Sequence, residues 1–215
     1  MTSIYLVRHA RSEGNEAGRF QGRTDTPLAP LGLEQAAYLA ERFAALPLDA
    51  IYASPLQRAR QTAAAIAACH NLEVQTEPDV IEIDLGDFEN RTLEEVSQLY
   101  PQELQAFDVS PHLFTAPKEG ESILDVYTRM VRGMGNIARR HPNQSVVVVS
   151  HGCAIRCYLS FAKAYPLERL GETEWGSNTG VSHIIYYQDK VSLHRINDVS
   201  HLPSKLITGG GGKKI

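Results

Sequence analysis

Two apolar runs, each ending beside a histidine, constrain the fold of this chain more than any other feature. Val146–Val149 is a run of four β-branched residues that leads to His151, and Ile4–Val7 leads directly to Arg8 and His9. Such runs are typical of strands covered on both faces, as in parallel sheets. Because ligands of open α/β sheets bind at the carboxyl ends of the strands, the pattern predicts two histidines at one sheet edge.

Positive charge at the end of the first run indicates an anionic ligand. Arg8 and His9 are adjacent where the strand must end, and the sequence that follows is polar and rich in glycine. One such run alone favours the simpler interpretation that a polar strand end meets solvent. The second run also ends on a histidine, His151, and this repetition favours a shared anion site.

A third cationic residue is predicted at the start of a helix. Ser54 is suited to cap that helix and Pro55 to occupy its first position, which places Arg58 in the first turn. An arginine there opposes the helix dipole, so a purely structural role is disfavoured. Together with the unpaired N–H groups of the first turn, Arg58 favours an anion site.

Two irregular segments are predicted to border this site. Residues 11–30 contain several glycines and prolines, which predict a loop. Residues 101–121 contain three prolines and two phenylalanines, which predict a lid over the sheet edge. The polar loop residues that can line a pocket are Arg11, Asn15, Arg19, Gln21 and Arg23.

Glu82 is the candidate acid, and the residues around it allow two interpretations. Residues 80–90 interleave apolar and acidic side chains, as in a half-buried strand with its carboxylates in water. Alternatively, Glu82 between two isoleucines is partly desolvated, which would raise its pKa and let it hold a proton near neutral pH. The spacing alone leaves both interpretations open.

The remaining patterns predict a layered α/β domain, a three-layer sandwich with a mostly parallel central sheet and helices on both faces. Helices are expected at residues 32–45, 56–69, 92–100, 122–141 and 153–162. Further strands are expected at residues 50–53 and 72–76, with a hairpin of residues 181–187 and 191–196 that turns at residues 188–190.

Composition limits the partners and the compartment. A chain of 215 residues that is 43% hydrophobic can bury one core, and its net charge of −4 provides no broad basic field for nucleic acid. The three cysteines, Cys69, Cys153 and Cys157, form no C-x-x-C pair, which fits a reducing compartment. With no leader and no apolar run of about 18 residues, a soluble, cytoplasmic protein without a membrane partner is expected.

The candidate site residues carry positive charge or can move a proton; they are Arg8, His9, Arg58, His151 and Glu82. Arginines would repel a metal cation, so neither a metal nor another cofactor is expected, whereas phosphate suits the set. The chain lacks the H-E-x-x-H motif of zinc hydrolases and the G-x-S-x-G motif of serine hydrolases. Metal and acyl hydrolases are therefore disfavoured.

Four separated segments resemble the histidine phosphatase superfamily, which includes the cofactor-dependent phosphoglycerate mutases. They occur in the family's order: Leu6–Ala10, Ser54–Ala59, Glu82 ahead of Gly86, and Ser150–Gly152. The resemblance implies a phosphoglycerate mutase-like fold that forms a single domain over residues 1–202. Residues 88–121 would then be an insert or lid, and residues 203–215 a flexible C-terminal tail.

The resemblance also implies a role for each site residue. His9 would be the nucleophile that becomes phosphorylated, and Glu82 the general acid. Nearby arginines would lower the pKa of His9 and keep it neutral, and the same cations would stabilise the transition state. The residues implied in substrate binding are Arg8, Arg11, Asn15, Gln21, Gly22, Arg58, His151 and Gly152.

Within the family, the chain looks most similar to metal-independent phosphoserine phosphatases, and broad-specificity phosphatases share many of the same residues. A small phosphate monoester that carries a carboxylate, such as phosphoserine, is the expected partner, and a homodimer is left open. Phosphoserine enzymes tend to have a histidine where this chain has Leu85, which cannot donate to a carboxylate. The alternatives are a phosphoglycerate mutase, disfavoured because the chain is short, and a non-catalytic phospho-ligand-binding module, disfavoured because His9 and Glu82 are both present.

Overall fold

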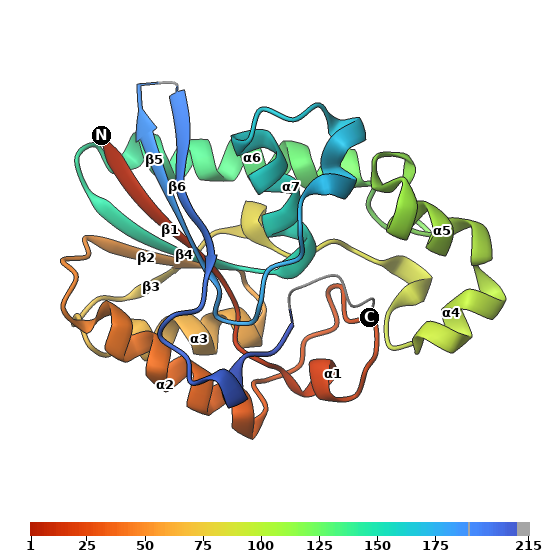
Figure 1. Cartoon of the computed structure of the whole chain (residues 1–215), viewed down its shortest axis with the longest axis horizontal. Coiled ribbons are helices and arrows are strands. Elements are labelled where there is room, and N and C mark those ends of the chain that lie inside the picture. The colour runs from red at the N-terminus through yellow and green to blue at the C-terminus, as the bar shows by residue number, and fades with distance from the viewer. Residues whose placement is uncertain (189, 210–215) are drawn as a thin grey trace.

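A six-stranded sheet in the order β3-β2-β4-β1-β5-β6 forms the centre of the computed structural model, which describes residues 1–188 and 190–209 (Figure 1). Its strands are β1 (Thr2–Arg8), β2 (Ala50–Ala53), β3 (Val74–Thr76), β4 (Ser145–Ser150), β5 (Val181–Tyr187) and β6 (Lys190–Asp198). β3, β2, β4 and β1 pair in parallel with one another, and β5 pairs antiparallel with both of its neighbours, β1 and β6. The predicted, mostly parallel sheet is confirmed; residue 189 of the predicted hairpin turn lies outside the described residues.

Helices cover both faces of the sheet. α2 (Pro30–Ala44) and α3 (Gln57–Ala67) lie on one face, and α6 (Ile123–Arg140) and α7 (Gly152–Ala162) on the other (Figure 1). Alternate residues of β4 belong to the two cores: Val146 and Val148 to the one that includes α6 and α7, and Val147 and Val149 to the one that includes α2 and α3. The predicted three-layer sandwich is thus confirmed, and burial of both strand faces explains the run of valines.

Three shorter helices belong to the irregular segments. α4 (Leu93–Leu99) and α5 (Pro101–Val109) extend to one side of the sandwich (Figure 1). α1 (Glu13–Glu16) is a single turn within the segment predicted as a loop, because Ser12 and Asn15 form a capping box there. Capping boxes of Thr92 with Glu95 and of Ser122 with Asp125 begin α4 and α6, the helices expected at residues 92–100 and 122–141.

Two local predictions are wrong. Ser54 does not cap α3, which begins at Gln57, because the Ser54 hydroxyl is hydrogen bonded to Nε2 of His151 at 2.6 Å instead. The stretch around Glu82 forms no strand but lies between two 3₁₀ turns, Pro78–Val80 and Gly86–Phe88. Gly86 turns the chain with a φ of +52°, where a Cβ atom would lie 1.9 Å from a carbonyl oxygen.

The C-terminal residues that the structure describes pack against the sandwich. Leu206 is buried, and Nε2 of Gln35 on α2 donates to the carbonyl of Leu206 and to the hydroxyl of Thr208, at 2.7 and 2.8 Å. The prediction of a flexible tail therefore fails for residues 203–209, because these contacts anchor them, and residues 210–215 lie outside the described part of the chain. Among the described helices, none combines the length and apolarity needed to cross a membrane.

Candidate active site

Neighbouring parallel strands bring the two predicted histidines together. Arg8 at the end of β1 pairs in register with Ser150 at the end of β4, so His9 and His151 follow at the same edge. Their ring centroids lie 5.1 Å apart. Nδ1 of His9 lies 2.7 Å from the carbonyl oxygen of Ala10; because a carbonyl only accepts, Nδ1 carries the proton and Nε2 remains for a ligand.

Both imidazoles are neutral at neutral pH. His9 is 3% exposed and His151 is fully buried. Burial is the main reason why the pKa of each lies well below its ordinary value of 6.5, and the positive charge of Arg58 lowers both further. A neutral His9 with Nε2 unprotonated has a lone pair for nucleophilic attack.

Two arginines supply positive charge, Arg58 buried and Arg8 half-buried. Arg58, in the first turn of α3 as predicted, is 1% exposed and donates from its two Nη atoms to the carbonyls of Thr24 and Gly22, at 2.8 and 2.7 Å. Arg8 donates from Nη1 to the carbonyl of Gly176 at 2.5 Å. In the described structure, the Nε atoms of both arginines and Nδ1 of His151 are buried without a protein partner. These nitrogens are therefore available as hydrogen-bond donors to an anion.

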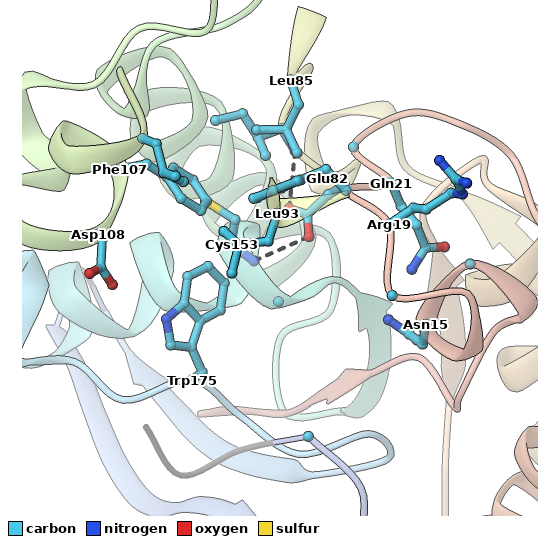
Figure 2. A pocket seen from close by; sticks show the side chains of 18 of the residues that line it. Asn15, Arg19, Gln21, Glu82, Leu85, Leu93, Phe107, Asp108, Cys153 and Trp175 are labelled. Carbon is cyan, nitrogen blue, oxygen red and sulfur yellow. Dashed lines mark hydrogen bonds between the residues drawn. The ribbon is translucent and has the colours of Figure 1, made fainter. Parts of the chain in front are cut away.

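Glu82 lies at the N-terminus of α7. Its Oε2 accepts from the backbone N–H of Cys153 at 3.1 Å (Figure 2). Its Oε1 accepts from the backbone N–H of Ala154 at 3.0 Å. These amides belong to the first turn of the helix that His151 precedes. The helix therefore places the candidate acid beside the candidate phosphate site.

A cavity of about 1040 Å³ contains most of the predicted set. The predicted residues that line it are Arg8, His9, Arg11, Asn15, Gln21, Gly22, Arg58, Glu82 and Gly152. His151 does not line it, although its ring centroid lies 5.1 Å from that of His9. Arg19 lines it while donating to the carbonyl of Asn90 at 2.6 Å. Arg23 is not among the lining residues, because its guanidinium pairs with Asp84 and Glu121.

A family model described as the histidine phosphatase superfamily (branch 1) matches residues 4–199. The chain belongs to the histidine phosphatase superfamily. This confirms the family that the four sequence segments indicated, and together with its phosphoserine phosphatase relatives it identifies the chain as a phosphatase.

Named relatives of this phosphatase match along nearly its whole length. Phosphoserine phosphatase 1 of Hydrogenobacter thermophilus is 42% identical over 203 residues, which are 94% of this chain and 95% of the relative. A metal-independent phosphoserine phosphatase of Arabidopsis thaliana is 34% identical over 207 residues, 95% of this chain and 84% of the relative. The solved structure of Bacillus stearothermophilus YhfR superimposes with a TM-score of 0.90 at 32% identity, covering 94% of this chain and 99% of that one.

The outer wall of the phosphatase cavity is largely apolar. Residues of α4 and α5, including Leu93 and Phe107, line it together with Leu85 and Trp175. Figure 2 shows these side chains on one side of Glu82, with Asn15, Arg19 and Gln21 on the other. The rings of Phe107 and Trp175 lie 6.0 Å apart. The segment predicted as a lid thus provides part of this wall.

Three residues of interest were not predicted from the sequence, two that line the cavity and one that does not. Trp175 lines the cavity, and Nδ2 of Asn178 donates to the carbonyl of His9 at 3.0 Å; both lie outside helices and strands, where no periodicity marks them. The third, Arg129, is buried on α6. It lies on the apolar stripe between Val126 and Met130, and a charged residue at such a position is a signal that the sequence does contain.

Proposed function

We propose that this phosphatase hydrolyses small phosphate monoesters in two steps, through a phosphohistidine formed at Nε2 of His9. One observation carries the proposal: the hydrogen bond from Nδ1 to the carbonyl of Ala10 leaves an unprotonated Nε2 at the floor of a cavity that Arg8 and Arg58 make cationic. Cations so placed offset the charge of the phosphoryl group and let a neutral nucleophile approach it.

In the first step, Nε2 of His9 forms a bond to phosphorus as the bond to the ester oxygen breaks. The departing alkoxide takes a proton from Glu82 and leaves as an alcohol. The spare Nε donors of Arg8 and Arg58 bind phosphoryl oxygens, and His151 adds its Nδ1 donor if Ser54 gives its hydroxyl proton to Nε2. In the second step, Glu82, now ionised, takes a proton from water as that water attacks phosphorus, which releases phosphate and restores His9.

The polar loop completes the proposed phosphate site. The side-chain oxygen of Asn15 accepts from the backbone N–H of Ser12 at 3.1 Å, and that of Gln21 accepts from the Ser12 hydroxyl at 2.8 Å, which leaves the amide N–H groups of both side chains as donors. Gly152, the first residue of α7, also lines the cavity. We assign these residues, with Gly22 and Arg11, to substrate binding.

Phosphoserine is the first substrate to test, because two of the similar proteins are named phosphoserine phosphatases. We propose that no metal takes part, since arginines occupy the positions from which a metal would neutralise the phosphate, and one relative is named metal-independent.

We also propose a single domain with residues 88–121 as its lid, and a cytoplasmic location, which the unpaired thiols of Cys69, Cys153 and Cys157 support.

The decisive experiment is a search for the phosphohistidine after removal of metals. Enzyme dialysed against EDTA is mixed with ³²P-labelled phosphoserine, quenched in alkali and tested for an acid-labile label on His9. Labelling together with steady hydrolysis supports the proposal. Loss of activity that Mg²⁺ restores overturns the metal-free mechanism, and 3-phosphoglycerate that is isomerised faster than it is hydrolysed would make the enzyme a mutase.

A further inference from the structure

Glu82 lies on backbone that the central sheet does not hold. In the described structure, residues 81–85 belong to no strand or helix. The amides of α7 contact the Glu82 carboxylate, but a carboxyl group that loses and regains a proton changes those hydrogen bonds during the reaction. Holding Glu82 in place through both steps therefore requires contacts on the backbone of its segment.

One buried guanidinium supplies such contacts. Arg129 of α6 is 8% exposed. Its Nη1 donates to the carbonyls of Asp79 and Ile81, at 3.0 and 2.5 Å, and its Nη2 donates to the carbonyl of Glu82 at 3.0 Å. A planar, permanently charged fork can satisfy several acceptors at once, whereas the ammonium of a lysine cannot reproduce that geometry.

Glu121 completes the attachment from the other side of Glu82. Its carboxylate pairs with Arg129 through two bonds of 2.9 Å, from Nε and Nη2, and accepts from the backbone N–H of Asp84 at 3.1 Å. Burial acts to raise the pKa of Glu121, but the hydrogen bond and charge of Arg129 outweigh it and lower that pKa. The pair therefore stays charged at neutral pH and fixes the segment on both sides of Glu82.

The same cluster reaches the phosphate side of the cavity. Nη2 of Arg23 lies 3.0 Å from Oε1 of Glu121. Arg23 follows Gly22, whose carbonyl accepts from Arg58. Glu121 thus links the segment of the candidate acid to the loop that holds a phosphate-binding arginine.

We propose that Arg129 and Glu121 are positioning residues that set where Glu82 delivers its proton to the leaving group. The inference rests on the proposed role of Glu82 as general acid. Arg129 touches neither the substrate site nor the Glu82 carboxylate, since it is absent from the cavity lining and contacts only backbone there. Its effect on catalysis passes through the position of Glu82 and so depends on how much protonation the leaving group needs.

Arg129→Lys tests this dependence, with Arg132→Lys as a matched control. Arg132 lies three residues later on α6, is 59% exposed and pairs with the side chain of Asp79, not with the segment's carbonyls. Because a displacement near 1 Å can cost about a hundredfold, a partial shift in Arg129→Lys should lower kcat/KM for propyl phosphate roughly tenfold. For p-nitrophenyl phosphate, whose leaving group needs little protonation, the loss should stay within about threefold. Arg132→Lys should leave both values unchanged.

Glu82→Gln, measured in parallel, separates the two ideas. A large loss confined to propyl phosphate supports the general acid, and equal losses on both esters overturn both the acid and this inference. If Glu82→Gln is selective but Arg129→Lys lowers both esters equally, only the positioning role is overturned.

Combining the substitutions and changing Glu121 provide further checks. In the Glu82→Gln background, Arg129→Lys should add less than about a twofold loss, because residues that act through one another are not additive. A full second loss overturns the inference. Circular dichroism and the thermal midpoint of unfolding show whether each variant folds.

Glu121→Gln keeps the shape of the side chain and provides a second test if Arg129→Lys does not fold. It should lower kcat/KM less than Arg129→Lys does, and again more for propyl phosphate than for p-nitrophenyl phosphate.

Discussion

The two halves of the cavity are held by different kinds of contact. On the phosphate side, His9 and His151 follow β1 and β4, which pair in continuous register over six residues of each strand. On the other side, Glu82 lies on irregular backbone attached by the side chains of Arg129 and Glu121. The positions of the histidines are thus fixed by a backbone ladder, and that of the acid by a few side-chain contacts.

This difference makes the two halves unequally sensitive to single substitutions. A parallel ladder shares its hydrogen bonds among many peptide groups, so no one side chain determines where the strand ends. An irregular segment held by a few contacts loses several bonds at once when one side chain that makes them, such as Arg129, changes. Substitutions on the phosphate side should therefore alter the chemistry of the site itself, and substitutions behind Glu82 should alter its geometry.

The largest effect is expected from His9→Ala. Loss of the nucleophile should lower kcat by more than about 10⁴-fold, by the same factor for every ester, and abolish the acid-labile label. Steady-state hydrolysis of p-nitrophenyl phosphate and propyl phosphate measures both factors. A variant that still forms labelled enzyme would assign the phosphohistidine to another residue.

The next effect is expected from Glu82→Gln, and unlike the first it should differ between esters. A general acid contributes about 10²–10⁴-fold where the leaving group needs its proton, so propyl phosphate should lose that much and p-nitrophenyl phosphate far less. Equal losses would direct attention to Asp84, Asp87 and Glu89. Each of these carboxylates already has a partner. Asp84 forms an ion pair with Arg23, Asp87 forms ion pairs with Arg91 and Lys118, and Glu89 accepts a hydrogen bond from the backbone N–H of Arg23.

The phosphate side was also the more predictable half. The valines of β4 and the apolar run of β1 mark strands by composition alone, and a strand's end follows from where such a run stops. Arg58 was placed in the first turn of a helix predicted to start at Ser54-Pro55. The helix starts at Gln57, so Arg58 does lie in its first turn, although the Ser54 hydroxyl is hydrogen bonded to His151 and does not cap the helix. Local patterns report burial and turns, and this half consists of strand ends and a helix start.

The acid side could not be predicted in the same way. The alternation around Glu82 suggests a strand, but the chain there turns at Gly86 and is held by Arg129, whose partners lie 47 to 50 residues away. Contacts between a side chain and a distant backbone carbonyl leave no period in the sequence. The one local sign was Arg129 itself, a charge on the apolar stripe of α6.

A smaller effect, on folding stability, is expected when the pH is lowered. The pKa values of His9 and His151 are held below 6.5 by burial, so the unfolded chain takes up protons that the folded chain does not, and stability is lost as pH falls below about 6.5. Each histidine should contribute about 1.4 kcal/mol to this loss between pH 7.5 and 5.5. In urea unfolding without phosphate, His9→Asn should lessen the loss by that amount. An unchanged loss in His9→Asn would contradict the lowered pKa.

The smallest effect concerns the apolar wall beside Glu82. Leu85 is buried in that wall and cannot donate to a substrate carboxylate. Leu85→His adds an N–H donor, and a hydrogen bond to a charged group is worth enough to raise kcat/KM for phosphoserine by up to roughly tenfold. The value for propyl phosphate, which lacks the carboxylate, should not rise, and Leu85→Met should improve neither substrate. An equal gain for both esters would mean that the wall limits access to the cavity and does not select against a carboxylate.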